Sequence, residues 1–256
     1  MTTLAFTPEQ YDPVTADSWL VCDTCGTQFP TADRTALKTC HICDDPRQFV
    51  PPSGQSFSTL GELKKQFKNE WTKCPSDPNI TFIHSTPKLA IGQRAILIKT
   101  PKGNILPILD DAVLFSPGGS HRVVDAGATA IKLGGHFPGS LVLHYNSRLF
   151  IADTLMTTAS GVGNWDVDAT GVERSSRPPG LNSFSFLWSI PNFIPLGVDE
   201  MARMWRALKD VEFTATHGGF MGMDIEHEDV KGRVLESMKI QAKFIGDKNF
   251  ESRISE

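Results

Sequence analysis

Two pairs of closely spaced cysteines constrain this chain more than any other feature. Cys22 and Cys25 form the first pair, Cys40 and Cys43 form the second, and fourteen residues separate the pairs. Two residues between thiols let both sulfurs face one tetrahedral ion, and the repeated spacing is typical of the two knuckles of a zinc ribbon. Gly26, directly after the first pair, allows the positive φ that such a knuckle often requires. The pattern predicts a zinc ion held by four thiolates.

The same four thiols have two other interpretations. They are reduced cysteines packed in a core, or redox-active dithiols, although chance rarely repeats this spacing. His41 lies inside the second pair and is a possible substitute ligand, but four cysteines already fill a tetrahedral shell. Because four protein ligands leave no position for water, we expect this zinc to fold the segment and not to catalyse.

Composition and charge restrict the partners. The chain has 256 residues, of which 40% are hydrophobic and 21% charged, enough for one sizeable core and a small appended module. The net charge of -4 gives no positive field that would gather phosphates, which predicts neither a nucleic-acid partner nor a membrane partner. Residues 1–13 show neither the basic start nor the apolar run of a secretory signal. We therefore expect a cytoplasmic protein, where reducing conditions favour metal ligation over disulfides.

A short proline-containing segment predicts how the chain is divided. Pro51 and Pro52 forbid a continuing strand ladder, and the residues after them are mostly small and polar, so residues 51–57 are interpreted as a linker. This linker separates a zinc-ribbon-like module at residues 1–50 from a larger domain at residues 58–256.

The larger domain begins with the pattern of a helix. Thr59 and Glu62 have the spacing of a capping box. Apolar residues then recur at three- and four-residue steps on one helical face, at Leu60, Leu63, Phe67 and Trp71. Pro75 is expected to end this helix.

Further elements indicate a layered α/β fold. Residues 101–104 have the composition of a turn between two strands of a hairpin. Strands are expected at residues 94–100, 105–106, 128–133, 140–145, 149–152 and 213–215. Helices are expected at residues 198–209 and 228–244. Strands followed by a mixture of strands and helices predict sheets covered by helices.

Three polar residues lie where a strand pattern gives way to turn residues. His136 stands in the glycine loop, which we define as residues 134–140, Asp153 ends an apolar run, and His217 precedes two glycines. Such loops let the backbone approach an ion closely. Each residue alone has a simpler interpretation, because a loop histidine often bonds to backbone and an aspartate after a strand often caps a turn. Their combination makes them candidate metal ligands.

The residues around these positions resemble a known family. The stretches GGHFPGSLVLHYNSRLFIADTL, FSFLWSIPNFIPL and THGGF, preceded by IGQRAILIKTPKGNIL, are similar to the metallo-β-lactamase-fold hydrolases, especially a branch with an N-terminal cysteine module. The resemblance covers most of residues 87–220. It implies an αββα sandwich in which His136 binds one metal, Asp153 bridges two metals and orients the nucleophile, and His217 binds the second metal.

One part of the family's pattern is missing. A His-x-His-x-Asp-His motif normally lies between the opening hairpin and the glycine-loop histidine, yet His121 is the single histidine between Leu106 and Gly135. By the usual lengths of a strand, a helix and a loop, roughly fifty to sixty residues are absent there. The resemblance therefore implies a shortened sandwich.

Two functions of different classes follow. The first is a metal-dependent hydrolase, in which hydroxide bound to one or two further zinc ions attacks an ester, thioester or amide of a small-molecule substrate. The second is a catalytically impaired or inactive relative that serves as a binding module, because a catalytic zinc needs about three protein ligands. Four other residues could be recruited as ligands: Asp110, Asp111, His84 and His121. No spacing among them resembles a metal motif.

An aromatic segment precedes the helix expected at residues 198–209. Its rings are those of Phe184, Phe186, Trp188 and Phe193. They line a substrate cleft or pack the sandwich, and packing is favoured because aromatic side chains are mostly buried.

Overall fold

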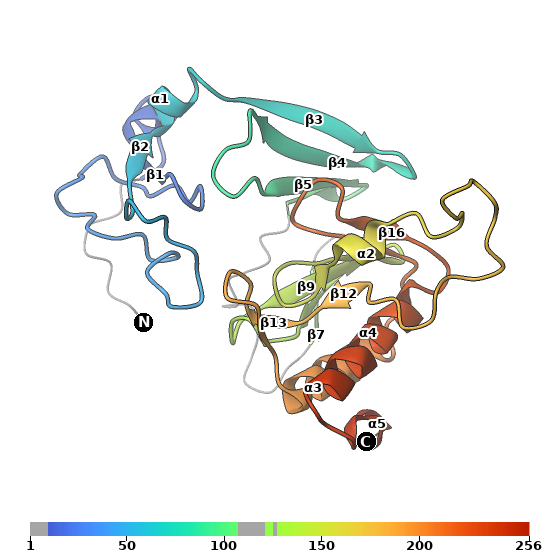
Figure 1. Ribbon diagram of the computed structural model, residues 1–256. Helices are drawn as coiled ribbons and strands as arrows, with labels where there is room; N and C mark the ends of the chain where they lie inside the picture. The colour runs from blue at the N-terminus through green and yellow to red at the C-terminus, as the bar shows by residue number, and fades with distance from the viewer. Residues whose placement is uncertain (1–9, 107–120, 125–126, 256) are drawn as a thin grey trace. The chain divides into compact units, whose positions relative to one another are not determined.

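The computed structural model describes residues 10–106, 121–124 and 127–255 (Figure 1). The chain is mixed α/β, with more strand than helix among these residues. None of the described helices combines the length and the apolar character needed to cross a membrane. The chain divides into two compact units, Met1–Ile96 and Leu97–Glu256, which are described separately. The predicted linker at residues 51–57 lies within the first unit, and the boundaries of independently folding domains stay a prediction.

The first unit begins with a small sheet that carries the first cysteine. The 3-10 helix η1 (Ala16–Ser18) leads into β1 (Leu20–Cys22), which pairs antiparallel with β2 (Phe57–Thr59). Cys22 lies opposite Phe57, and both side chains belong to one apolar cluster around the cysteines. The last residue of the predicted linker, Phe57, is therefore part of a strand that pairs with β1, because β1 needs a partner strand for its backbone hydrogen bonds.

The helix predicted next is shorter than expected. Its capping box is confirmed, since the Thr59 hydroxyl accepts a bond from the Glu62 amide at 3.2 Å and the Glu62 carboxylate accepts one from the Thr59 amide at 3.0 Å. However, α1 (Leu60–Leu63) is one turn long, and its expected continuation is β3 (Lys68–Cys74). The predicted continuation was wrong because its apolar stripe faces no core, as the 62% exposed Trp71 shows, so pairing with a neighbouring strand prevails.

That neighbouring strand belongs to a four-stranded sheet in the order β3-β4-β5-β6. β3 pairs antiparallel with β4 (Asp77–Thr86), and the chain turns back between them at Pro75. β5 (Arg94–Thr100) and β6 (Gly103–Ile105) form the hairpin that the sequence predicted. The division between the two compact units falls within β5.

The second unit is built on a six-stranded sheet in the order β16-β15-β10-β9-β8-β7. The strands are β7 (His121–Val124), β8 (Ala128–Lys132), β9 (Leu141–Tyr145), β10 (Arg148–Phe150), β15 (Ala215–His217) and β16 (Asp224–Glu226). β10 and β15 run parallel, whereas the other neighbours are antiparallel. The strands predicted at residues 128–133, 140–145 and 149–152 are confirmed, and the one predicted at 213–215 begins later, at Ala215.

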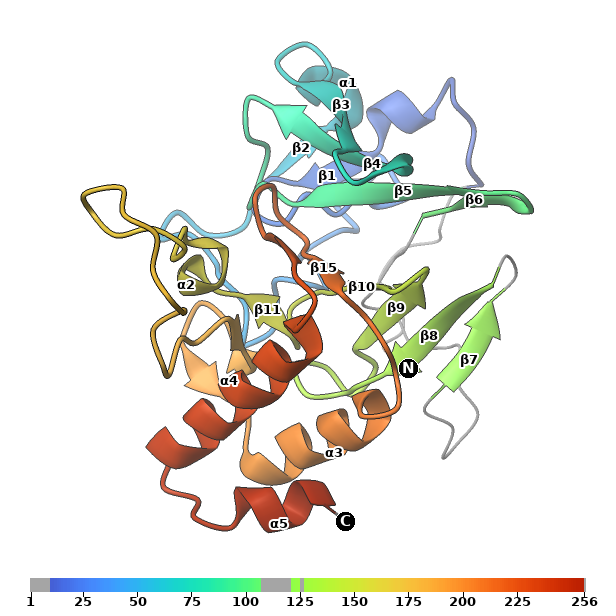
Figure 2. The ribbon, with the colours of Figure 1, turned by 90° about the vertical axis from the view of Figure 1, so that its right-hand side faces the viewer.

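Three helices lie together in the second unit (Figure 2). They are α3 (Val198–Leu208), α4 (Val230–Phe244) and α5 (Phe250–Ser255), so the two helices predicted from the sequence are confirmed. Met201 and Leu208 of α3 are fully buried and share one apolar cluster with Leu149 of β10. The helices therefore cover a face of the six-stranded sheet, because their apolar stripes need that burial.

Several short elements complete the second unit: β11 (Met156–Thr157), α2 (Ala159–Val162), β12 (Phe184–Ser185), β13 (Leu187–Ser189) and β14 (Ile194–Pro195). The aromatic segment divides between core and surface. Phe184 and Phe186 are fully buried, whereas Trp188 is 38% exposed and Phe193 is 81% exposed. The packing prediction is thus confirmed for the first two rings and wrong for the other two, because those lie on the hairpin of β13 and β14.

Candidate functional site

The four paired cysteines come together in the first unit. The Sγ atoms of Cys22 and Cys43 are 3.8 Å apart, those of Cys25 and Cys40 are 3.6 Å apart, and all four lie within 4.8 Å of one another. A tetrahedron with metal–sulfur bonds of about 2.3 Å has edges of about 3.8 Å. Gly26 has φ +79°, as the spacing predicted. The cysteine cluster, meaning these four residues, therefore has the size and chemistry of a metal site.

The charges of the cysteine cluster also favour a cation. Hydrogen bonds from Cys22 and Cys40 lower the pKa of the Cys25 thiol to about 2, so one thiolate is readily formed. Hydrogen bonding with its neighbours raises the pKa of Cys40, and burial raises the pKa of Cys43 to about 12. Four thiolates therefore cannot share this buried space unless a cation neutralises them.

Two glutamine side chains outside the cluster hold its backbone. The Gln55 side-chain oxygen accepts a bond from the Cys40 amide at 2.6 Å, and the Gln93 side-chain nitrogen donates to the Cys25 carbonyl at 2.5 Å. Each contact holds the backbone of one of the two cysteine pairs. Nothing in the spacing of the cysteines could have indicated these residues, because each comes from a distant part of the chain.

The glycine loop places His136 in the second unit. Gly135 has φ +84°, and a Cβ there would lie 2.7 Å from a Leu196 methyl, so only glycine fits. The His136 amide donates to the Thr154 hydroxyl at 3.1 Å, and that hydroxyl donates to the Gly134 carbonyl at 2.7 Å. Thr154 thus ties the loop to the residue directly after Asp153.

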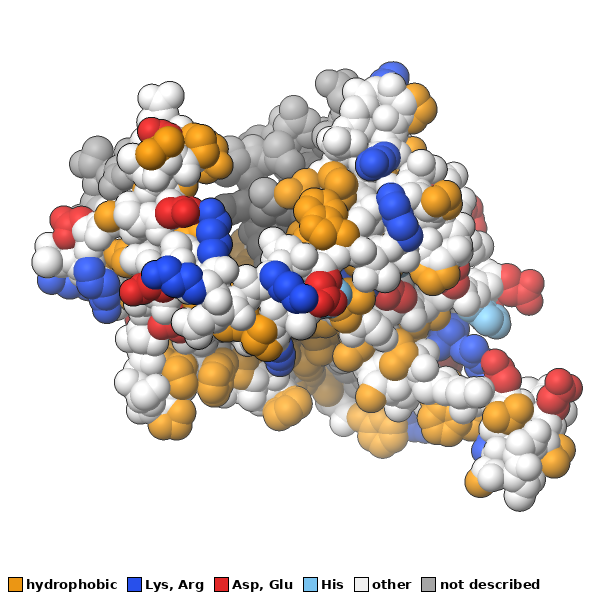
Figure 3. All heavy atoms as spheres, turned by 90° about the horizontal axis from the view of Figure 1, so that it is seen from above, with side chains coloured by type: hydrophobic (Ala, Val, Ile, Leu, Met, Phe, Trp, Pro, Cys, Tyr) orange, Lys and Arg blue, Asp and Glu red, His pale blue; other side chains and the backbone are white. Residues whose placement is uncertain are grey.

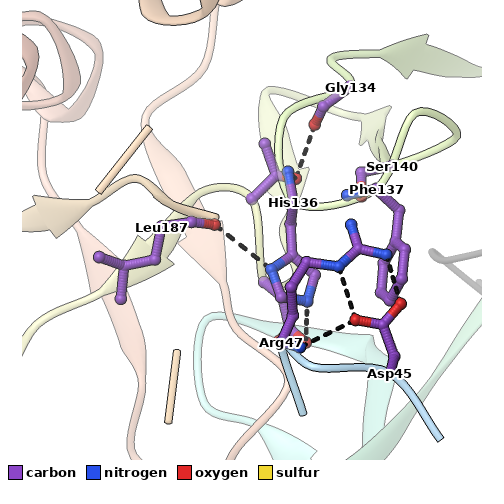
Figure 4. A network of polar contacts seen from close by, with 9 residues as sticks. Asp45, Arg47, Gly134, His136, Phe137, Ser140 and Leu187 are labelled. Carbon is purple, nitrogen blue, oxygen red and sulfur yellow. Dashed lines mark hydrogen bonds and ion pairs between the residues drawn. The ribbon is translucent and has the colours of Figure 1, made fainter. Parts of the chain in front are cut away.

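His136 and Asp153, predicted as ligands of one centre, lie next to each other. His136 is 1% exposed, and its Nδ1 is 3.3 Å from the Leu187 carbonyl (Figure 4). Its Nε2 is 3.7 Å from Asp153 Oδ2. Because a carbonyl only accepts, we assign the ring proton to Nδ1, which turns the lone pair of Nε2 toward the carboxylate. The ring nitrogen and the carboxylate oxygen both offer lone pairs to the space between them, an arrangement that suits a shared proton or a shared cation.

His217 lies at the end of a different strand and has other partners. It is the last residue of β15, not the residue after the strand as expected, and it is fully buried. Its Nδ1 is 2.9 Å from Asp224 Oδ1, and its Nε2 is 3.2 Å from Arg148 Nη1. The ring stacks on Phe150, with 5.3 Å between the ring centroids.

The sheet register relates these positions to one another. Phe150 and His217 are partners in the parallel pair of β10 and β15, and the Ile151 amide donates to the His217 carbonyl at 2.9 Å. Asp153 and Gly218 consequently follow neighbouring strand ends, and both line a small hollow with an enclosed volume of about 20 Å³. The remaining wall is mostly apolar. Carboxyl ends of parallel strands are a common place for ligand sites.

The structure does not gather all three predicted ligands. Among the residues that it describes, the ligand atoms of His136, Asp153 and His217 do not all lie within 4.8 Å of one another. Asp110 and Asp111 lie outside the described residues. The sequence also gave no sign of Thr154 or Arg148 as partners, although both neighbour predicted elements.

Partial burial of Asp153, whose side chain is 30% exposed, predicts a pH-dependent cost in stability. Desolvation raises the pKa of this carboxyl above 3.8, although His136 lowers it in part. An aspartate whose pKa is raised by folding disfavours the folded state at neutral pH, and this penalty disappears as the pH falls below 3.8. We expect Asp153→Asn to raise Tm at pH 7 by about 2–4 °C, or about 1 kcal/mol for this size of protein.

Thermal melts of both proteins across pH 3.5–7 would check this expectation, with the exposed Asp210→Asn as the matched control. The advantage of Asp153→Asn must shrink toward acidic pH. A lower Tm at pH 7 would mean that the ionised carboxylate stabilises the fold.

The Thr154 hydroxyl predicts a second measurable effect. Thr154→Val keeps the side-chain volume but leaves the buried His136 amide and the Gly134 carbonyl without this partner. We expect a loss of about 1–3 kcal/mol in the free energy of unfolding, measured by urea denaturation. The exposed Thr170→Val serves as the control, and equal stability of the two variants would contradict the role of Thr154.

The distribution of charge on the surface does not indicate a particular class of binding partner. Lys and Arg side chains are interspersed with Asp and Glu on the face shown in Figure 3. Mixed charges produce no strong field of one sign. The predicted lack of nucleic-acid and membrane partners stays a prediction.

Comparison with known proteins gives one distant relative. No family model matches the chain. It is 24% identical to the uncharacterized protein YmaE of Bacillus subtilis (strain 168), over 82% of this chain and 92% of the relative. The alignment runs over 267 residues, whereas 82% of 256 residues is about 210, so about 57 aligned positions have no counterpart in this chain.

Proposed function

We propose that this chain is a zinc-stabilised, shortened relative of the metallo-β-lactamase-fold hydrolases and that its second unit binds a small molecule without hydrolysing it. The observation that carries this proposal is the pairing of His136 with Asp153 at 3.7 Å while His217 is engaged by Asp224 and Arg148. Helices packed on a mixed sheet and the glycine loop support the αββα sandwich that the resemblance implied.

The described residues around His136 and Asp153 provide too few ligands for a catalytic zinc ion. A catalytic zinc takes three protein ligands and keeps one open position for water, and a smaller ligand set holds the metal and its hydroxide poorly. His136 and Asp153 supply two donor atoms in the described part of the second unit. We therefore assign no reaction step to a metal there.

The hollow beside Asp153 is suited to binding instead. Asp153 offers a hydrogen-bonding carboxyl at the end of β10, and Leu155, Met156 and Phe220 offer apolar contact on the wall. Ligand pockets combine apolar walls with a few placed polar groups, and this hollow has the same combination but can hold only the end of a ligand. The ligand that fits is a small, mostly apolar molecule with one group that bonds to the carboxyl.

The cysteine cluster has a different role in the proposal. Its four sulfurs fit zinc in number, spacing and charge, and they leave no open position. The zinc we assign there folds the first unit and takes no part in chemistry. A cytoplasmic location would keep these thiols reduced.

Hydrolysis is the second candidate function, and one observation favours it. Asp153 and Gly218-Gly219 line the same hollow at the ends of two parallel strands, as a metal-dependent hydrolase of this fold would require. The third ligand would have to come from residues such as Asp110 and Asp111. An ester, thioester or amide would be the substrate.

Zinc content and hydrolysis distinguish the two functions. We would measure zinc per chain by mass spectrometry of the intact protein and of a His136→Ala, Asp153→Ala, His217→Ala triple variant, and assay both with ester, thioester and amide substrates. The proposal expects one zinc in each protein and no hydrolysis. Additional zinc in the intact chain, lost together with hydrolysis in the triple variant, would establish the hydrolase.

A further inference from the structure

The guanidinium of Arg148 lies beside the ring nitrogen of His217 that does not face Asp224. The Nη1 atom of its guanidinium lies 3.2 Å from His217 Nε2 and 3.2 Å from Glu226 Oε1. The His217 side chain is fully buried, and the Arg148 side chain is 13% exposed. The cation therefore reaches the histidine inside the protein, not at the surface.

The chemistry of these groups determines the proton on the ring. A guanidinium only donates hydrogen bonds, so His217 Nε2 must accept and the ring proton must be on Nδ1. That proton is donated to Asp224 Oδ1 at 2.9 Å. A carboxylate that orients a histidine whose other nitrogen faces a cation is the arrangement found around zinc ligands, and here the cation is a guanidinium.

The register of the sheet builds this arrangement. β10 and β15 are parallel neighbours, and β16 pairs with β15 so that His217 lies opposite Asp224. Asp224 and Glu226 alternate along β16 with the buried Ile225 between them, which gives their side chains the same face. Arg148 of β10 and the two carboxylates of β16, Asp224 and Glu226, thus surround the ring from the two strands that flank β15.

We infer that Arg148 is a built-in cation that takes the place of a metal ion at His217. The inference goes beyond the proposed function, because it concerns a position that binds neither the structural zinc nor the small molecule. An arginine stays charged at any pH the protein meets, and its planar donors bridge the ring and the Glu226 carboxylate together. A metal that bound His217 Nε2 would have to displace a largely buried guanidinium from both partners.

The test follows the ring nitrogens of His217 by 15N NMR while zinc is added to the protein whose cysteine cluster is already loaded. We expect the spectrum of a neutral ring with the proton on Nδ1, unchanged by excess zinc. A zinc-dependent shift of these nitrogens in the unaltered protein would overturn the inference, and this measurement needs no variant.

Two variants at position 148 make the test specific. Arg148→Gln removes the cation, and we expect the His217 nitrogens of that variant to shift on zinc addition, whereas Arg148→Lys keeps the charge and stays unresponsive. Arg206→Gln, which removes an arginine that bonds a backbone carbonyl elsewhere, is expected to behave like the unaltered protein. An Arg148→Gln variant that folds but ignores zinc would contradict a role for Arg148 in excluding the metal.

Discussion

Cys22→Ser is expected to abolish zinc binding and to unfold the zinc-ribbon-like part of the first unit. Structural zinc contributes on the order of 10 kcal/mol to the folding of such small modules, and a serine hydroxyl does not replace a thiolate ligand. We expect zinc content to fall from one per chain to nearly none. Hydrogen exchange should then lose protection at residues 18–50 and also in β2, because Cys22 lies in the strand that pairs with it.

The second unit should keep its protection in the same experiment, because its apolar cluster shares no residue with the cluster around the cysteines. Cys74→Ser is the matched control. Cys74 is buried and its sulfur lies 3.3 Å from the Ser76 hydroxyl, but it does not belong to the cysteine cluster, so zinc content should stay at one. Loss of all secondary structure by circular dichroism in Cys22→Ser would show that the two units do not fold separately.

Phe184→Ala is expected to destabilise the second unit by about 3–5 kcal/mol, as other deletions of buried aromatic rings do. Phe184 is fully buried in the core cluster, and its amide bonds to the Ser237 hydroxyl of α4 at 3.1 Å. The cavity left by the ring would separate β12 from α4. Urea denaturation followed by tryptophan fluorescence would measure the loss.

Phe193→Ala is the matched control, since it removes the same ring from the same segment at an 81% exposed position. We expect a change within about 0.5 kcal/mol. Similar losses in both variants would mean that the surface hairpin is buried in solution. A small loss in Phe184→Ala would contradict the placement of the core.

Prediction from the sequence succeeded where neighbours in the chain decide the structure. The capping box of Thr59 and Glu62 and the hairpin of β5 and β6 formed as expected, because their contacts span a few residues. The helix expected after Leu63 failed because its apolar pattern was interpreted without knowing that β4 would pair with it. The spacing of apolar residues alone does not distinguish a helix from a strand when no core packs against those residues.

The same distinction between local and long-range contacts applies to the cysteine cluster and to the candidate ligands of the second unit. The sequence by itself determined the cysteine cluster, because the spacing within each pair and the chemistry of thiolates already specify a tetrahedral metal site. It also marked His136, Asp153 and His217 as residues at strand ends.

Only the tertiary structure decided how those three residues associate. It placed His136 beside Asp153, and it joined Arg148 to His217 across 69 positions of the chain. The contact of Arg148 with His217 depends on the register of β10 against β15, and a register is a property of the packed sheet that no local pattern contains.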